Sequence, residues 1–170
     1  MNGRETMSEK IKTNAMRILD KEKIKYTPHE YSHDEGAVDG ITAALKMGIE
    51  PQRVFKTLVT RGASHEVYIF DIPVSKELDL KKAAKAVGEK SVEMVHVDEI
   101  NKLTGYVRGG CSPIGMTCGG SKKQYKTVLD SCAQNYSEIV ISAGKIGYQT
   151  ELSPTCLLNL VKGKFEDVVY

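Results

Sequence analysis

The sequence predicts one α/β domain of the α+β type, built on a mixed β-sheet. The chain has 170 residues, of which 41% are hydrophobic and 27% charged, which suits one folded domain. Short runs rich in β-branched residues are interrupted by isolated helical stretches, without the regular strand–helix–strand alternation of a doubly wound sheet. No repeat or interdomain linker divides the chain. We therefore expect residues 8–170 to form one domain behind a loose leader at residues 1–7.

In the first third, apolar residues at helical spacing predict a helix over residues 9–22, with Ser8 as its cap. Residues 25–31 alternate weakly and contain Pro28, which favours an edge strand. An apolar stripe predicts a second helix over 37–47, ended by Gly48. Pro51 then opens a β-branched strand over 54–60.

In the middle third, a turn at 61–65 leads to a partner strand over 66–72 that ends at Pro73. Asp79 is a suitable cap for a helix through Val87, and Gly88 is a suitable stop. A strand is expected over 92–97. Asp98 is then expected to cap a helical turn before Gly105.

The last third begins with a glycine-dense stretch that cannot hold regular structure, at 105–115 and 119–121. Strands are expected at 126–130 and 138–142, and a second glycine loop at 142–147 follows the latter directly. Ser153 and Pro154 open a helix over 154–161, and residues 165–170 are expected to close the sheet. Glycine lets backbone N–H groups approach a ligand closely, so we expect one pocket walled by both loops. The alternative for the longer segment is an ordinary surface loop.

The strand over 54–60 contains a lysine at a position where apolar residues are expected. Two-residue alternation places Lys56 on one face with Val54 and Leu58. Burying an ammonium among apolar side chains costs free energy unless an anion or a lone pair meets it. Two interpretations follow: Lys56 extends to solvent from an edge strand, or it anchors an anion or a carbonyl group inside a pocket.

Charge and composition limit the classes of function. The net charge of +2 is too small to indicate nucleic-acid binding by bulk charge, so such a partner would need a local patch. No stretch approaches the roughly 18 uninterrupted apolar residues of a membrane span, and the polar start lacks a signal-peptide core. We expect a cytoplasmic protein without a membrane association.

The four cysteines lack the close spacing of a zinc knuckle or a redox motif, so free thiols are expected. Cys111 and Cys118 lie in glycine-rich sequence and are expected to be accessible. Cys132 and Cys156 resemble small core residues.

A zinc-hydrolase pattern, H-E-x-x-H, occurs at His29, Glu30 and His33. In such enzymes the two histidines share one helix face and the glutamate is the base. Here Pro28 directly precedes the pattern and residues 23–27 carry no helical apolar stripe, so a supporting helix would be short. A zinc hydrolase is retained as an alternative function.

Several ordered segments together resemble the YbaK family of Cys-tRNA(Pro) deacylases, within the superfamily of bacterial prolyl-tRNA synthetase editing domains. The resemblance covers nearly the whole chain from about Lys12. Its segments are H-D at 33–34, V-F-K-T-L at 54–58, L-K-K-A-A-K at 80–85, V-E-M at 92–94, T-G-Y at 104–106, G-G-C-S-P-I-G at 109–115 and S-A-G-K at 142–145.

The resemblance implies a compact fold with a barrel-like central sheet and a pocket into which Lys56 projects. It implies Lys56 as the catalytic residue, with no metal and no cofactor. The substrate-binding residues that it implies are Tyr31, Thr57, Gly109, Gly110, Ser112, Pro113, Ile114, Gly115, Ser142, Ala143 and Gly144. Two features depart from the family pattern: an insertion from Thr117 to Ser121, and Gln149, which stands where some relatives have an acidic side chain.

The implied reaction is trans-editing: hydrolysis of cysteine mischarged onto tRNA(Pro), with Cys-tRNA(Cys) as a further substrate. The resemblance implies that the substrate's own thiol attacks its carbonyl while Lys56 and glycine-loop N–H groups position the ester. The implied partners are the acceptor end of the mischarged tRNA and prolyl-tRNA synthetase. Three alternatives remain open: an Ala-tRNA(Pro) deacylase, a non-catalytic tRNA- or synthetase-binding module, and the zinc hydrolase. The sequence does not indicate an oligomeric state.

Overall fold

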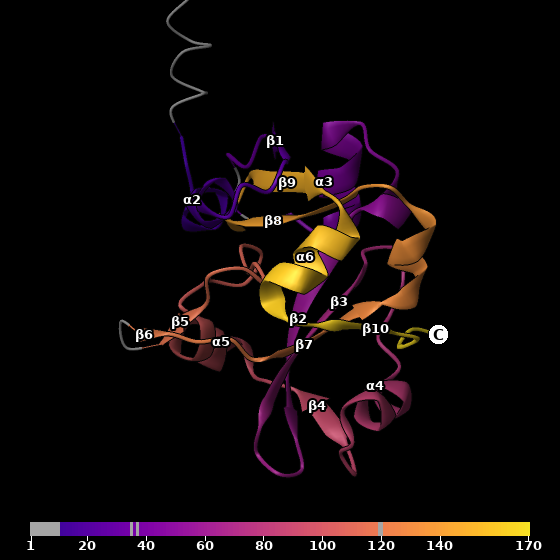
Figure 1. Ribbon diagram of the computed structural model, residues 1–170. Helices are drawn as coiled ribbons and strands as arrows, with labels where there is room; N and C mark the ends of the chain where they lie inside the picture. The colour runs from indigo at the N-terminus through magenta and orange to yellow at the C-terminus, as the bar shows by residue number, and fades with distance from the viewer. Residues whose placement is uncertain (1–10, 35, 37, 119–120) are drawn as a thin grey trace, which may run out of the picture.

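The largest sheet has five strands and mixed direction (Figure 1). The computed structural model describes residues 11–34, 36, 38–118 and 121–170. Strand β2 is antiparallel to its neighbours β3 and β4, whereas β3, β7 and β10 run parallel to one another. These observations confirm the expected mixed sheet. In spatial order its strands are β10 (Lys164–Glu166), β7 (Lys126–Asp130), β3 (Val67–Pro73), β2 (Phe55–Gly62) and β4 (Val92–Met94).

A second, antiparallel sheet has three strands in the order β1-β9-β8. They are β1 (Thr27–Glu30), β9 (Tyr148–Leu152) and β8 (Ile139–Lys145). As expected, the strand that contains Pro28 lies at a sheet edge, where a missing N–H removes no ladder bond. A short hairpin, β5 (Thr117–Cys118) and β6 (Ser121–Lys122), stands apart from both sheets.

Over the described part of the chain, the two larger sheets do not close into a barrel. Between the two larger sheets, the described residues form one isolated parallel bridge, from Val54 to Val140. A barrel requires continuous hydrogen bonding around its circumference. Here β8 and β2 diverge after a single bridge, and Figure 1 shows β8 and β9 lying above the five-stranded sheet.

Helices α4 (Leu80–Val87) and α6 (Pro154–Val161) lie where the sequence predicts them. The Asp79 and Ser153 side chains accept the capping hydrogen bonds, which confirms both caps. Helix α3 (Gly40–Met47) begins later than predicted, because Asp39 accepts a hydrogen bond from the Thr42 N–H and so caps it.

Two further helices have caps other than those predicted. In α2 (Asn14–Lys21), Thr13 is the cap; the predicted cap Ser8 lies outside the described residues. In α5 (Val97–Thr104), the N-cap is His96, and Asp98 lies in the first turn.

The segment 142–147 is not the independent loop that the sequence suggested. Strand β8 runs through Gly144 to Lys145, and an irregularity between Ser142 and Lys145 accommodates the glycine. Strand β9, which pairs with it, had no sequence prediction. The strand predicted over 92–97 ends at Met94.

Two cysteine predictions are reversed. Cys111 is buried, although glycine-rich sequence suggested access, and Cys156 is exposed on α6 although the core was expected. Cys132 is partly buried. Burial depends on what covers each side chain, which local composition does not determine.

The main core lies between the two sheets, where α2 and α6 cover their facing surfaces (Figure 1). Leu19 from α2, Leu129 from β7 and Leu157 from α6 pack there against Ile139, Ile141 and Leu152. On the other face of the five-stranded sheet, Phe70 and Ile72 pack against Ala83 and Ala84 of α4. No helix within the described ranges is long and apolar enough to cross a membrane.

Buried Asp130 ties the end of β7 to the C-terminal segment. Its Oδ1 accepts a hydrogen bond from the Val168 N–H at 3.0 Å, and its Oδ2 accepts one from the Cys132 N–H at 3.1 Å. Asp130 is 2% exposed and Val168 fully buried. An Asp130→Ala substitution would leave both donors without this acceptor.

We expect Asp130→Ala to lower the free energy of unfolding by about 2–4 kcal/mol, because buried unpaired donors are costly. Urea denaturation measures the change. Asp79→Ala, which removes the partly exposed cap of α4, is the control, with an expected loss of about 1 kcal/mol. Equal losses in the two variants would show that the buried hydrogen bonds of Asp130 contribute no more to the free energy of unfolding than an ordinary helix cap.

Candidate functional site

The candidate site is built on an uncovered edge of β2. Strand β4 pairs with β2 only from Thr60 to Gly62, and the Val95 N–H extends this contact to the Val59 carbonyl at 3.1 Å. Between Val59 and the Val54 bridge, no strand within the described residues covers that edge. Because N–H and C=O directions alternate with a period of two, the backbone polar groups of Thr57 point to the same edge as those of Val59.

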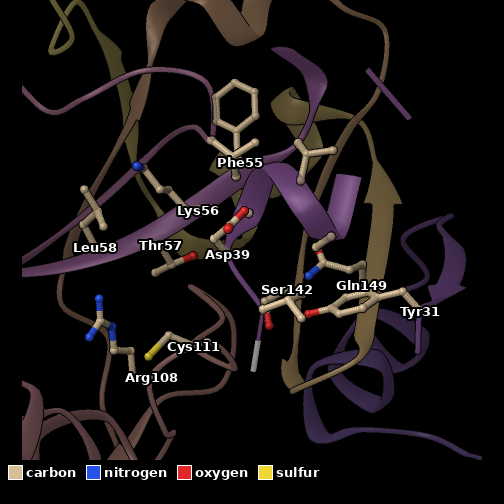
Figure 2. A pocket seen from close by; sticks show the side chains of 16 residues that line it. Tyr31, Asp39, Phe55, Lys56, Thr57, Leu58, Arg108, Cys111, Ser142 and Gln149 are labelled. Atoms are coloured by element: carbon tan, nitrogen blue, oxygen red, sulfur yellow. The ribbon is translucent and has the colours of Figure 1, made fainter. Parts of the chain in front are cut away.

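A pocket of about 580 Å³ opens along this edge (Figure 2). Its size is within the range of small-molecule sites. Residues from β2, from the N-terminus of α3, from the segment 108–111 and from the β8–β9 sheet form its wall. They are Tyr31, Val38, Asp39, Gly40, Ala43, Val54, Phe55, Lys56, Thr57, Leu58, Val74, Arg108, Gly109, Cys111, Ser142 and Gln149.

Lys56 lines this pocket without being buried. Its side chain is 32% exposed, and its Nζ lies 3.8 Å from Oε2 of Glu77, a side chain that is itself 82% exposed. Such a long ion pair with a solvated carboxylate contributes little. The ammonium therefore remains available to an anion or a carbonyl oxygen, and the uncovered edge explains how a lysine is accommodated in this strand.

A second cation, Arg108, also lines the pocket. Figure 2 shows its guanidinium extending toward Leu58, beside Cys111. Arg108 is exposed, and no hydrogen bond or ion pair is found for it with the described residues. An arginine in this state suits a phosphate, which it can bind through two parallel hydrogen bonds.

The opposite wall is uncharged and polar. Figure 2 shows the Tyr31 hydroxyl directed toward Ser142, with Gln149 beside them. Tyr31 and Gln149 are buried, and Oε1 of Gln149 is buried without a hydrogen-bond partner among the described residues. Ser142 Oγ accepts a hydrogen bond from the Gly144 N–H at 3.1 Å. This wall can orient a ligand through neutral hydrogen bonds.

Thr57 connects the pocket to a buried carboxyl group. Its hydroxyl donates to Oδ1 of Asp71 at 2.5 Å, and Asp71 is fully buried on the neighbouring strand β3. Burial raises the pKa of Asp71 to about 7, while the Thr57 hydrogen bond opposes the rise. Burial also raises the pKa of the Cys111 thiol to about 11, so this thiol stays protonated near neutral pH and is a poor nucleophile.

Of the residues that the family resemblance implied, five line the pocket: Tyr31, Lys56, Thr57, Gly109 and Ser142. The other seven do not belong to its wall. They are Gly110, Ser112, Pro113, Ile114, Gly115, Ala143 and Gly144.

Two of the three glycines among these seven residues, Gly115 and Gly144, pack against Tyr106 and Asn14. The Tyr106 hydroxyl donates to the Ile114 carbonyl at 2.5 Å, and Asn14 Nδ2 donates to the Gly115 carbonyl at 3.1 Å. A Cβ at Gly144 would lie 2.8 Å from the Tyr106 ring, and one at Gly115 would lie 2.9 Å from Asn14 Nδ2. These glycines allow the two segments to approach closely.

The geometry required by the zinc pattern is absent. His29 lies in strand β1, not on a helix, and its Nε2 is 2.7 Å from Oε1 of Glu151. His33 Nδ1 is 3.2 Å from the Tyr31 carbonyl oxygen. Within the described residues, no group of three or more His, Cys, Asp or Glu side chains could hold a metal ion. The expectation that two histidines share a helix face is therefore not met.

Sequence reasoning missed several wall residues, of which Asp39, Arg108, Cys111 and Gln149 carry the chemistry. Asp39 follows the zinc pattern in the sequence and carried no prediction, and Gln149 was identified only as a departure from the family pattern. Arg108 stands directly before the G-G-x-S-P-x-G segment, and this adjacency was the available signal. Asp71 carried a signal as well, being a lone carboxylate in a strongly apolar strand.

Comparison with known proteins identifies the class. A model of the aminoacyl-tRNA editing domain matches residues 35–160, and this chain belongs to that family. The resemblance to an editing-domain superfamily is thereby confirmed.

A full-length relative is found in Enterococcus faecalis (strain ATCC 700802 / V583), under the name "Putative Cys-tRNA(Pro)/Cys-tRNA(Cys) deacylase EbsC". It is 47% identical over 157 residues, which cover 92% of this chain and 93% of the relative. A solved structure named "Crystal structure of a putative trans-editing enzyme for prolyl tRNA synthetase" is 25% identical with a TM-score of 0.76, over 92% of this chain and 96% of that one. The hypothetical protein APE2540, at 20% identity and a TM-score of 0.77 over 91% and 97% of the two chains, shares the fold.

The buried Asp71 predicts a particular dependence of stability on pH. Its pKa is raised from 3.8 to about 7 in the folded state. Between these values the folded chain holds a proton that the unfolded chain releases, so this group makes the protein less stable as the pH rises. The slope is at most about 1.4 kcal/mol per pH unit.

We expect Asp71→Asn to remove this slope. Relative to the wild type, the variant should therefore gain stability between pH 5 and pH 8, measured by urea denaturation at each pH. Asp98→Asn, which removes an exposed carboxylate in α5, serves as the control and should not reproduce the gain. A constant difference between Asp71→Asn and the wild type across this range would mean that Asp71 ionises normally in the fold.

Proposed function

We propose that this protein hydrolyses the ester bond of cysteinyl-tRNA, as a trans-editing enzyme for cysteine mischarged onto tRNA(Pro) and with Cys-tRNA(Cys) as a further substrate. The observation that carries the proposal is Lys56 at the uncovered edge of β2, lining a pocket together with Arg108. Membership of the editing-domain family and the name of the Enterococcus relative support the substrate class.

The pocket suits the aminoacylated acceptor end of a tRNA. An aminoacyl ester is already reactive, so the protein must mainly orient it and stabilise the oxyanion that develops on its carbonyl. Lys56 supplies a positive charge for that oxygen. We assign Arg108 to a phosphate of the acceptor end, and Tyr31, Ser142 and Gln149 to the orientation of the aminoacyl and ribose groups.

The attacking group is assigned to the substrate. Cys111 lines the pocket, but its thiol has a raised pKa, and the geometry pairs His29 with Glu151 rather than with a nucleophile. In the proposed step the cysteinyl sulfur bonds to its own carbonyl carbon, and the ester C–O bond breaks. The thiol proton passes to the released tRNA hydroxyl. Water then opens the resulting cyclic thioester to give free cysteine.

This chemistry explains how cysteine is distinguished from proline. Binding differences between small side chains of similar size supply only about 1–3 kcal/mol. A thiol that performs the reaction separates the two amino acids chemically. Recognition of the tRNA body is assigned to prolyl-tRNA synthetase as a partner, since the net charge of this chain is only +2. The cytoplasm is the proposed location.

We expect Lys56→Ala to lower kcat for Cys-tRNA(Pro) deacylation by about 10²–10³-fold, the usual loss when one oxyanion-stabilising group is removed. A single-turnover assay with labelled cysteine measures the rate. Lys81→Ala, an exposed lysine on α4, is the matched control and should retain the wild-type rate. Near-normal turnover in Lys56→Ala, with an intact fold by circular dichroism, would remove Lys56 from the mechanism.

We expect wild-type protein to hydrolyse Cys-tRNA(Pro) at least about tenfold faster than Ala-tRNA(Pro), because alanine lacks the attacking thiol. The difference should persist in the presence of a chelator. Equal rates on the two substrates would favour an alanine-editing enzyme with a water nucleophile. Loss of activity on chelation, restored by zinc, would favour a metallohydrolase.

A further inference from the structure

The buried Asp71 has no role in the reaction described above, yet it lies directly behind the pocket wall. It is fully buried, and its Oδ2 has no hydrogen-bond partner among the described residues. A buried carboxylate oxygen without a hydrogen bond is costly, and this cost is the reason that burial raises the pKa of Asp71 to about 7. Among the described residues, the side-chain group that bonds Asp71 is the Thr57 hydroxyl, at 2.5 Å.

This hydrogen bond determines what Thr57 offers to the pocket. A threonine hydroxyl has one proton and two lone pairs. When Asp71 is ionised it can only accept, so the Thr57 proton is donated to it and the Thr57 oxygen presents only lone pairs to the pocket that it lines. Thr57 is therefore an acceptor there, and the carboxyl group behind it strengthens that character. The matching ligand group is a hydrogen-bond donor, and a cationic donor fits best.

Among its described residues, the pocket wall holds one carboxylate, that of Asp39, besides the cations Lys56 and Arg108. Of the cations in its wall, neither Lys56 nor Arg108 forms an ion pair with Asp71. Lys56 extends from the opposite face of β2 to Thr57, as alternation along a strand requires. The exposed carboxylate of Asp39, which caps α3, lines the same pocket as Thr57 and adds negative charge to its wall.

We propose that Thr57, held by Asp71, binds the free α-ammonium group of the aminoacyl ester, with Asp71 acting as a positioning residue. This assignment rests on the proposed function and specifies the substrate further: an ester with an unmodified amino group. The ammonium and the ester carbonyl are attached to adjacent carbon atoms. Thr57 and Lys56 are adjacent residues at the uncovered edge, so they can receive these two groups together.

The test compares Cys-tRNA(Pro) with N-acetyl-Cys-tRNA(Pro). Acetylation removes the ammonium and leaves the thiol and the ester, so the reaction chemistry is unchanged. We expect the wild type to prefer the free amine by about 10- to 100-fold in kcat/KM, as is typical of a hydrogen bond to a charged group. Thr57→Val and Asp71→Asn should reduce this preference to below about threefold.

Two variants serve as controls. Thr57→Ser keeps the hydroxyl and should keep the preference. Thr60→Val removes a buried hydroxyl from the same strand, one that bonds the Tyr68 carbonyl, and should change stability without changing the preference. Because the readout is a ratio of two substrates, a general loss of folded protein lowers both rates and leaves the ratio intact.

The outcomes separate this inference from the proposed function. If the wild type deacylates both substrates equally, or if Thr57→Val or Asp71→Asn retains the full preference, the ammonium assignment is overturned and the deacylase function stands. If the wild type hydrolyses neither substrate, the proposed function fails and the assignment with it. Binding of an amide-linked cysteinyl-adenosine to the wild type, compared with its N-acetyl form, provides a measurement independent of turnover. Equal affinities would also overturn the assignment.

Discussion

The site depends on one gap in backbone pairing. Strand β2 is paired with β3 along its length, but its other edge meets β4 at three residues and β8 at one bridge. The edge between these contacts leaves backbone hydrogen-bonding groups exposed, and such groups require water or a ligand. Side chains from both faces of β2 reach the same opening. Lys56 and Thr57 can therefore act on one ligand although they point in opposite directions.

The pocket contains both positive and accepting groups. Lys56 and Arg108 bring positive charge to its wall, while Thr57, backed by Asp71, and the carboxylate of Asp39 offer acceptors. An aminoacyl ester carries the complementary features, a carbonyl oxygen that becomes negative and an amino group that is positive. With the reactive thiol on the substrate, the protein needs no activated nucleophile of its own. The protonated state of Cys111 agrees with that division of roles.

The glycine-rich segments serve the site indirectly. Gly115 and Gly144 allow two chain segments to converge on Tyr106 and Asn14, and burial raises the pKa of the Tyr106 hydroxyl to about 12. That hydroxyl holds the Ile114 carbonyl and so fixes the segment that follows Arg108. The short distances explain why glycine is needed there, because a Cβ would overlap with an aromatic ring or an amide. Most residues of the glycine-rich segments therefore do not line the pocket; they pack behind the residues that do.

The sequence by itself determined the local elements. The helices capped by Asp79 and Ser153, the strands β2, β3 and β7, and the mixed sheet follow from caps, periodicity and β-branched content within a few residues. Lys56 was also identifiable, since an ammonium in an apolar run is anomalous wherever the strand lies.

Only the tertiary structure decided which residues meet. The separation of the two sheets, the pairing of β9, the burial of Cys111 and the exposure of Cys156 all depend on segments far apart in the sequence. The contact between Thr57 and Asp71 joins residues fourteen positions apart, and its significance depends on burial that local composition does not encode. The physical reason is that hydrogen-bond pairing between strands and the exclusion of water are nonlocal, whereas propensity and capping act within a few residues.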